Sequence, residues 1–582
     1  MYVLSYTHTL IVHHFMRLWL VVLLLALGGG WLLSRINGAR KDRRHCGKAP
    51  RAAEKFRLAD GVAIAVFCLF VCLYIAQMVY GEDFGYYDND QLTDFSAVGN
   101  AFRPPIWPVE GRFFPLGHQE FNFLQHFTRT AAGYQCIVAV QLVVLLAVAF
   151  VALRECKPRY RVLTLVAIMT APSFLVPFCG LIYPDRNVLF WLGILVFCLA
   201  GYEKHRARTY FLGCLAATQF VLYYKETVVV FLAAYCLGRL LLETYLSRRA
   251  GNPSWRQIAK ENSLTLAMMG ITGIYCVLFV VGMSGYSGFS YVSGLRLDLK
   301  TTVLAYVETD WLLPVFVLTL VWRLYRSLRR REQLDPVWEP LAWGALAYVL
   351  SLVALRLFRD YYLALFDLVA FLYLAHVLAD RVRPRLKLRT AIVATVLACI
   401  VLHNAAYSAL NIVERKTVIQ LNRELADFLE GYRPSNKTPA VELFFPWSDG
   451  YRLMELSSYF NYRGLPVAGQ TADRPSARPT LIFEGTAKFP NGLCVAYKQY
   501  RCVTAASPPA GGLGVILPDD RVSTKELAEF RQSSTELLSR EPWPVHSSKE
   551  MWLRALHAMA WEYWRRREPQ HLWQLHVFRK TT

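Results

Sequence analysis

Long apolar runs alternate with short polar segments over roughly the first two thirds of the chain. Each run holds roughly 17–22 residues, which is the length at which an α-helix crosses the hydrocarbon core of a bilayer. Runs of this length with few charges predict membrane-spanning helices rather than the core of a soluble domain. The predicted spans are residues 16–34, 60–80, 132–153, 161–180, 187–201, 209–223, 226–243, 263–284, 311–328, 339–357, 361–378 and 389–407.

The charge distribution predicts how these spans are oriented. The chain has 582 residues, of which 55% are hydrophobic, and a net charge of +21. Its mean hydropathy is +0.27. The basic residues gather in alternate connections, as in Arg35–Arg57 with its nine Lys and Arg, while the other connections are poor in them. By the positive-inside rule the basic connections are cytoplasmic. The positive charge therefore indicates membrane topology and contact with anionic lipid, and it excludes nucleic acid as the partner.

This orientation divides the chain into three parts. Residues 1–58 hold an N-terminal span and a basic cytoplasmic loop, and residues 59–408 form a transmembrane domain with a large outer loop at 81–131. Residues 409–582 follow as an extracytoplasmic soluble domain. The fold class predicted is a polytopic α-helical membrane protein of about 11–12 spans with a C-terminal α+β domain. The basic loops and the lack of organellar signals favour a bacterial inner membrane, with the outer parts in the periplasm.

The C-terminal region shows mixed periodicity. A helical pattern occupies residues 412–432 and ends at Gly431. Strand-like runs follow at 440–445, 479–485, 493–505 and 514–518, and two more helical patterns lie around 524–539 and 549–567.

The cysteines lie mostly inside apolar runs, where a thiol behaves as a small hydrophobe. No Cys or His set has the spacing of a zinc site. Cys494 and Cys502 differ because they flank a predicted hairpin in the outer domain, where oxidation is allowed. A disulfide between them is one prediction, and two free or buried thiols are the alternative.

The outer loop 81–131 carries the strongest chemical signal. It holds seven acidic residues against three basic ones. Asp88 and Asp90 stand at the start of a predicted interfacial helix, whose dipole stabilises a carboxylate as the anion. Such a carboxylate can act as a general base for a sugar hydroxyl, or can hold a divalent cation such as Mg²⁺ or Mn²⁺. The alternative is that both residues cap the helix and face water.

The stretch "NDQLTDFSAVGN", Asn89 to Asn100, resembles the first outer loop of the GT-C superfamily of integral-membrane glycosyltransferases. It is most similar to the arabinofuranosyltransferase-like branch, where the loop begins with a paired acid, a short helix and an Asn. Asn89 stands where the first acid is expected, Asp90 keeps the second position, and Asp88 is placed to substitute for the first. The resemblance implies a polyprenyl-phosphate sugar as donor and an outer soluble domain at the end of the chain.

Other outer turns also carry charges at membrane depth, where ionisable residues are functional candidates by default. The resemblance implies a phosphate site, to which we assign Lys225, Arg356 and Arg359. Polar residues of the outer loop and of these turns are assigned to substrate binding. They are Asn89, His118 and Glu120 in the loop, and Asp185, Arg186 and Glu226 in the turns. The alternatives are ion pairs within the turns, Lys225 with Glu226 and Asp185 with Arg186, and arginines that reach lipid headgroups.

The predicted function is therefore that of an inverting glycosyltransferase, transferring a hexosyl or pentosyl group. An Asp of the first outer loop deprotonates the hydroxyl of a glycan, lipid or protein acceptor, and the lipid phosphate leaves. The alternative is a non-enzymatic transporter, flippase or envelope scaffold; an O-antigen polymerase or ligase is a third possibility. Transporters commonly show inverted repeats and charges in the middle of spans, and the sequence predicts neither here.

Overall fold

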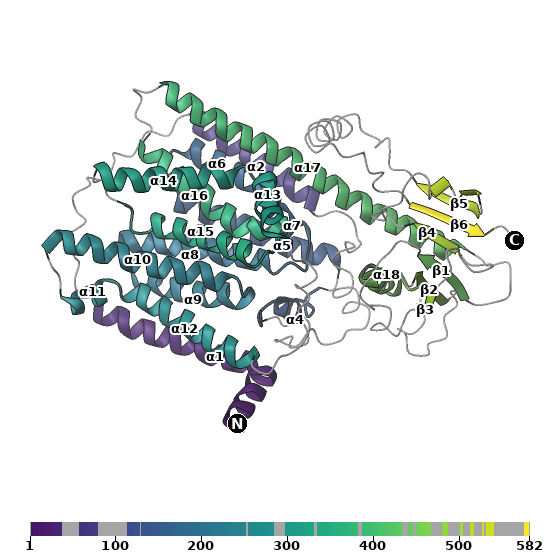
Figure 1. The fold of residues 1–582 in the computed structure, drawn as a ribbon, viewed down its shortest axis with the longest axis horizontal. Coiled ribbons are helices and arrows are strands. Elements are labelled where there is room, and N and C mark those ends of the chain that lie inside the picture. Colours follow the sequence, from purple (N-terminus) through teal and green to yellow (C-terminus); the bar gives the residue numbers. More distant parts are fainter. Residues whose placement is uncertain are drawn as a thin grey trace.

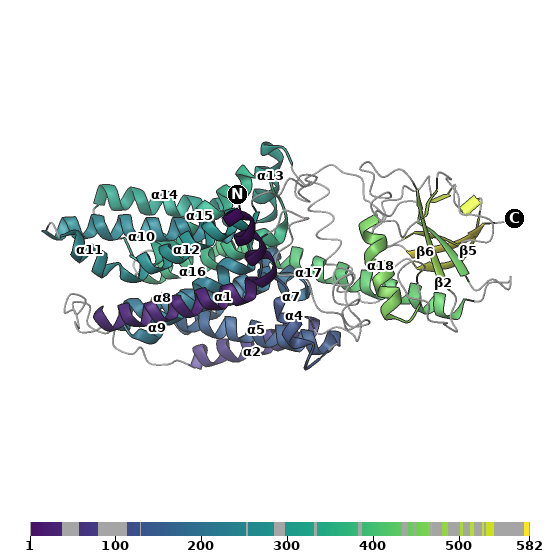
Figure 2. The same ribbon diagram turned by 90° about the horizontal axis from the view of Figure 1, so that it is seen from below.

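The computed structural model describes the helical part of the chain almost continuously and the C-terminal part in pieces. The described residues are 2–37, 58–78, 113–128, 130–251, 254–283, 297–330, 334–381, 387–432, 440–445, 450–465, 467, 480–486, 501–503, 513–516, 527–528, 531–532, 534–540 and 575–580. Long, roughly parallel helices form a bundle, and a sheet lies beyond one end of it (Figure 1, Figure 2). We call this the domain-side end of the bundle, and the other the opposite end.

Each predicted span falls, over most of its length, on one helix of the bundle or on two consecutive ones. The helices are α1 (Tyr2–Asn37), α2 (Leu58–Met78), α4 (Gln119–Leu124), α5 (Ala131–Ala152), α6 (Pro158–Thr170), α7 (Pro172–Cys179), α8 (Asp185–His205), α9 (Arg208–Tyr224), α10 (Val228–Gly251), α11 (Trp255–Glu261), α12 (Ser263–Met283), α13 (Leu299–Thr309), α14 (Leu312–Arg330), α15 (Trp338–Ala354), η5 (Asp360–Leu363), α16 (Ala364–Arg381) and α17 (Lys387–Gly431). Among the described residues, seven helices are long and apolar enough to cross a membrane, or nine if each of two bent pairs counts as one span. Helices α9 and α15, on two further predicted spans, have 17 residues each.

Two pairs of consecutive helices are sharply bent at a short break, which the sequence analysis did not predict. Residues 161–180 were expected to form one span, but the chain turns by 70° between α6 and α7. Pro172 begins α7, and Ala171 before it is extended. Proline lacks the N–H that would continue the helix, and it disfavours the helical conformation in the preceding residue. A second bend of 94° separates α13 from α14, where Asp310 is extended.

The outer surface of the bundle is apolar. Leu25 of α1, Val66 of α2 and Leu318 of α14 expose 70%, 61% and 69% of their surface. In water such continuous apolar surface would be unfavourable, whereas lipid tails solvate it at no cost. The outward-facing side chains therefore identify the bundle as an integral membrane domain.

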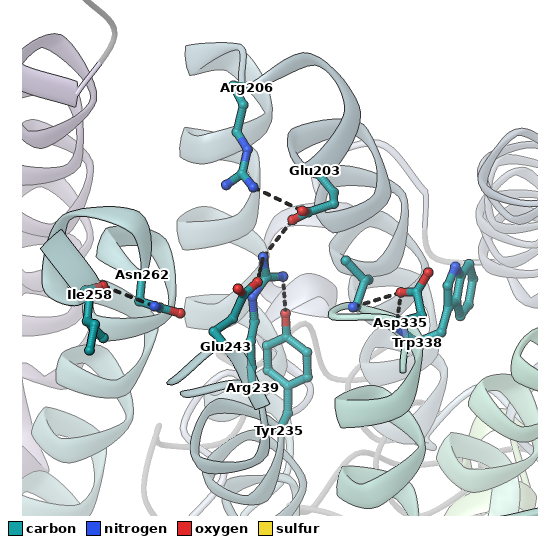
Figure 3. A network of polar contacts seen from close by, with 10 residues as sticks. Glu203, Arg206, Tyr235, Arg239, Glu243, Ile258, Asn262, Asp335 and Trp338 are labelled. Carbon is teal, nitrogen blue, oxygen red and sulfur yellow. Dashed lines mark hydrogen bonds and ion pairs between the residues drawn. The ribbon is translucent and has the colours of Figure 1, made fainter. Parts of the chain in front are cut away.

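A buried ion network joins helices α8 and α10 toward the opposite end of the bundle (Figure 3). Arg239 of α10 donates to the hydroxyl of Tyr235 at 3.1 Å and to Glu203 of α8 at 2.6 Å. Glu243 lies 4.0 Å from the same guanidinium. Arg206, at the end of α8, donates to Glu203 from a more exposed position. A second buried contact joins α14 to α15, with Arg323 donating to Glu339 at 2.8 Å.

A six-stranded sheet forms the C-terminal domain, in the order β3-β2-β1-β4-β6-β5. Its strands are β1 (Ala440–Phe445), β2 (Thr480–Thr486), β3 (Arg501–Val503), β4 (Leu513–Ile516), β5 (Ser534–Arg540) and β6 (Leu575–Lys580). Strands β3, β2, β1 and β4 pair in parallel, and β6 pairs antiparallel with both β4 and β5. Helix α18 (Gly450–Tyr462) connects β1 to β2, as a parallel pair requires.

The sequence analysis predicted β1, β2 and β4 and placed β3 inside a longer run. The helical pattern around 524–539 is wrong over its last part, because Ser534–Arg540 is strand β5. This strand exposes most of its side chains and pairs with β6, so its residues do not show the alternation of a half-buried strand. Strand β6 was not predicted. The pattern at 549–567 lies outside the described residues.

Helix α17 belongs to both parts of the molecule. It runs without interruption across residues 408 and 409, the predicted domain boundary, and ends at Gly431 as expected. Ile400 is buried in the core of the bundle, whereas Leu421, Leu425 and Leu429 are buried in the core of the sheet domain. One continuous helix thus joins the two cores.

The ion network at the opposite end yields a stability prediction. Replacing Arg239 with Met should destabilise the protein by at most about 3–5 kcal/mol, because it removes the closest cation of the partly buried Glu203 carboxylate and leaves it the exposed Arg206. The matched control is Arg206→Gln, which removes the exposed partner of the same carboxylate and should cost at most about 1 kcal/mol. Unfolding of both variants in detergent measures the difference. Equal losses would contradict the assignment of Arg239 as the buried anchor.

Candidate active site at the domain-side end

Several predicted site residues lie outside the described part of the chain. These are Asp88, Asn89 and Asp90, together with Cys494. Cys502 is described only as part of the backbone of β3. The general base, the cation at the acid pair and the disulfide therefore stay predictions.

Two of the predicted outer turns meet in a buried ion pair. Asp185 begins α8, and Lys225 follows the last residue of α9. The Nζ atom of Lys225 lies 3.0 Å from Oδ1 and 2.8 Å from Oδ2 of Asp185. The side chains are only 6% and 8% exposed. Each charge also suits its helix end, since an N-terminus favours an anion and a C-terminus favours a cation.

Aromatic rings from a third turn cover this ion pair. The Nζ atom of Lys225 lies 4.6 Å from the ring centroid of Tyr362 and 5.4 Å from that of Tyr361, both in η5. The hydroxyl of Tyr348 donates to the carbonyl of Tyr362 at 3.1 Å and holds the turn in place. A cation over an aromatic face is stabilised further when it is removed from water. The structure thus brings residues of the three turns together around Lys225.

A second polar group is built around Glu120 of α4. Asn187 donates to Oε1 of Glu120 at 2.5 Å, and Arg186 contacts the same oxygen at 3.4 Å. Arg186 also donates to the carbonyl of Leu181 at 2.9 Å, and Gln141 of α5 donates to Asn187 at 3.0 Å. Because Asp185, Arg186 and Asn187 are consecutive, the two groups form one unit. We call Glu120, Asp185, Arg186, Asn187 and Lys225 the ion cluster.

Helix α4 is held against the cluster by the segment before it. The N–H of Leu116 donates to the carbonyl of Tyr223, near the end of α9, at 3.0 Å. Phe113 is fully buried and packs edge-on against Phe15 and Tyr275. His118 has φ 68°, a left-handed conformation that turns the chain into α4. The last part of the predicted outer loop 81–131 therefore returns directly to the ion cluster.

Glu120 differs electrostatically from an exposed glutamate. Burial raises the pKa of its carboxyl group, against the smaller lowering effects of Arg186, a backbone hydrogen bond and Asn187. Its Oε2 atom is buried and has no hydrogen-bond partner among the described residues. With two acidic and two basic side chains the ion cluster is neutral as it stands. It presents a carboxyl oxygen that can hydrogen-bond to a ligand or take up a proton.

The remaining predicted site residues that the structure describes lie outside the ion cluster. The side chains of Arg356 and Arg359 are exposed on the connection that leads into η5. Arg356 has φ 57°, and its carbonyl accepts from the N–H of Leu297 at 3.2 Å. His118 is buried among Phe114 and Phe121. Glu226 is partly buried, and the ion-pair partner of Lys225 is Asp185 rather than Glu226.

The sequence analysis missed several buried polar residues. Asn187 donates to Glu120, and the partly buried Gln141 donates to Asn187; neither gave a charge signal. The expectation that no span carries a charge in its interior is wrong, because Asp367 of α16 is fully buried inside a predicted span, and Asp310 is buried where α13 meets α14. A single acidic residue in an otherwise apolar run was the available signal.

Metal ligands are not grouped in the described part of the chain. No three His, Cys, Asp or Glu side chains there are close enough together to hold a metal ion. The divalent cation expected at Asp88 and Asp90 concerns residues outside that part.

The apolar surface, the spanning helices and the buried ion cluster at one end define a polytopic integral membrane protein with a C-terminal domain. No protein-family model matches the sequence. No curated protein matches it either. Two solved structures of ArnT from Cupriavidus metallidurans are similar, one bound to undecaprenyl phosphate and one in the apo state. Each is 13% identical and covers 89% of this chain and 98% of its own, with TM-scores of 0.45 and 0.46 respectively.

Both TM-scores lie below 0.5, so this likeness carries no argument about the function of the chain.

The buried ion pair yields a prediction of energetic coupling. Asp185→Asn or Lys225→Met alone should destabilise the protein by about 3–5 kcal/mol, because either change leaves one buried charge unpaired. The double variant should lose clearly less than the sum, since neither charge remains. Thermal and denaturant unfolding of the four proteins in detergent gives the coupling energy.

The control for this cycle is Arg356→Gln, which removes an exposed charge near the same end and should change stability by about 0.5 kcal/mol or less. Additive losses in the cycle would show that Asp185 and Lys225 do not act as a pair.

Proposed function

We propose that the protein is an inverting glycosyltransferase that moves a sugar from a polyprenyl-phosphate donor to the hydroxyl of an extracytoplasmic glycan, lipid or protein. The observation that carries this proposal is the ion cluster at the end of a bundle whose outer face is apolar. A polyprenyl-phosphate sugar matches this arrangement, because its apolar chain stays in lipid and its charged phosphate head lies at the membrane surface.

The acidic outer loop supplies the chemistry in this proposal. Asp90, or Asp88 in its place, removes the proton from the acceptor hydroxyl. The hydroxyl oxygen then attacks the anomeric carbon, and the bond from that carbon to the phosphate oxygen breaks on the opposite side, which inverts the configuration. If a divalent cation takes part, the same two carboxylates are the residues we assign to it. Helix α4 supports this proposal, because it lies near the end of the outer loop and its Glu120 contacts Arg186 and Asn187 of the ion cluster.

The leaving phosphate needs positive charge close to the membrane surface. We assign Lys225, Arg356 and Arg359 to this role. Lys225 lies over the rings of η5, and Arg359 immediately precedes this turn, so the two cations are attached to one local structure. The sugar is then assigned to Asn89, His118, Glu120, Asp185, Arg186 and Glu226. In the proposed orientation the reaction takes place at the outer face of the inner membrane.

An ion-coupled transporter is the second candidate function. Two bent helix pairs and a buried pair of carboxyl groups favour it, since broken helices around buried charges are common in transporters. We rank it second because the ion cluster and the described end of the acidic loop, residues 113–128, lie at one end of the bundle.

A transfer assay tests the enzyme directly. Wild-type protein in lipid nanodiscs is given a panel of polyprenyl-phosphate sugars and acceptors. Asp90→Asn or Asp88→Asn should lower the transfer rate at least about 100-fold, the usual contribution of a general base, with donor binding unchanged. Asp94→Asn, in the same loop but without an assigned role, is the matched control.

The possible outcomes separate the hypotheses. Normal transfer by both the Asp88 and the Asp90 variants would place the base elsewhere. If wild-type protein transfers no sugar from any donor, the glycosyltransferase proposal fails and the transporter becomes the leading hypothesis.

A further inference from the structure

A second buried polar site lies where the two bent spans meet α16 and α17. Ser173 stands in the first turn of α7, just after the first bend, and Asp310 occupies the second bend. Asp367 lies near the beginning of α16, and Asn404 lies within α17. All four residues are at most 2% exposed. Four elements that are distant in sequence therefore place polar side chains together inside the membrane domain.

The two bends expose backbone groups that the site and its surroundings satisfy. The N–H of Leu312, at the start of α14, donates to Oδ1 of Asp310 at 2.9 Å. The carbonyl of Thr170, at the end of α6, accepts from the hydroxyl of Ser408 of α17 at 2.7 Å. Non-helical backbone inside a membrane persists where protein groups replace the lost helix hydrogen bonds. The bends are therefore built features of this part of the fold.

The carboxyl groups of Asp310 and Asp367 form a pair. The hydroxyl of Ser173 donates to Oδ2 of Asp367, and Asp310 is the charged group that acts on Asp367. The amide nitrogen of Asn404 donates to Oδ1 of Asp310 at 3.3 Å. We call Asp310, Asp367, Ser173 and Asn404 the carboxyl-pair site.

Three buried oxygen atoms of this site receive no hydrogen bond from an N–H or hydroxyl donor of the described residues. They are Oδ2 of Asp310, Oδ1 of Asp367 and Oδ1 of Asn404. A proton shared between the two adjacent carboxyl groups can pair two of these oxygens, but it leaves the Asn404 oxygen without a donor or a cation. The Asn404 oxygen is independent of the acidic pair, because it comes from a neutral amide on another helix.

The carboxyl groups of the site are not ion-paired with a cation in the described part of the chain; His403 of α17, next to Asn404, acts on Asp310 electrostatically but forms no ion pair with it. Among the described residues no Lys, Arg or His forms an ion pair with either carboxyl group, in contrast to Asp185 and Glu339 in the same bundle. Two adjacent carboxyl groups in such surroundings cannot both stay ionised alone, and a pair that holds one proton still has a charge of −1. One positive charge would make the site neutral.

We propose that the carboxyl-pair site binds one small monovalent cation, with Na⁺ as the probe, through oxygens of Asp310, Asp367 and Asn404. Carboxylate and amide oxygens are hard ligands that suit such ions and offer nothing to soft metals. A multivalent metal fits less well, because no third His, Cys, Asp or Glu joins the pair in the described chain.

The bound cation would hold both bent spans against α16 and α17. Binding is therefore expected to stabilise the folded protein whether it acts as an enzyme or as a transporter, and the proposal does not depend on the proposed function.

The test is unfolding of the full-length protein in detergent at fixed pH and ionic strength. Choline chloride is replaced stepwise by NaCl, LiCl or KCl. We expect Tm to rise with Na⁺ until it saturates, and this shift to disappear in Asp367→Asn and Asn404→Leu. Asp298→Asn is the matched control, because Asp298 is an exposed acid that caps α13 on the same bent pair, and it should keep the full shift.

If a variant does not fold, a direct measurement of Na⁺ binding to the wild-type protein tests the proposal. Wild-type protein is incubated with radioactive Na⁺, and saturable binding displaced by unlabelled Na⁺ but not by choline is expected. Ser173→Ala, which removes one hydroxyl from Asp367, should weaken this binding. Equal stabilisation by all salts, no saturable binding to wild type, or a shift lost in Asp298→Asn would each overturn the proposal.

Discussion

Charge inside an apolar bundle is stable only where other groups of the protein neutralise it, and this constraint governs both ends of the molecule. At the opposite end, Arg239 is held by Glu203 and Arg323 by Glu339. At the domain-side end, Asp185 is held by Lys225 within the ion cluster. Each pair joins different helices. The same contacts therefore neutralise the buried charges and fix how the helices pack against each other.

The same constraint explains how the membrane domain tolerates bent spans. A break in a helix exposes backbone N–H and C=O groups to lipid unless protein groups meet them. Asp310 and Ser408 supply those hydrogen bonds at the two bends. The carboxyl-pair site differs from these pairs, since neither of its acids forms an ion pair with a basic side chain of the described residues. An unbalanced site beside two bends is where a bound ion would have the greatest effect on the fold.

Helix α17 connects the helical bundle to the sheet domain as one continuous element. Its first half packs in the bundle and carries Asn404, and its second half lies in the core of the sheet domain. A continuous helix transmits position better than a flexible linker, because its backbone hydrogen bonds resist bending. The sheet domain is thereby held beyond the end at which the ion cluster lies (Figure 2). In the proposed reaction this is the side from which an acceptor arrives.

The sequence by itself determined the membrane class, the approximate positions of the helices on which the predicted spans fall, and three strands of the sheet. These features are local, because hydrophobic length, charge placement and helix ends depend on neighbouring residues. Tertiary structure alone decided that Lys225 pairs with Asp185, that Glu120 joins Arg186 and Asn187, and that Asp310 lies beside Asp367. It also made a strand of Ser534–Arg540, whose polar residues gave a helical pattern. The physical reason is that a buried charge takes whichever partner the packing brings near, and that partner can lie anywhere in the chain.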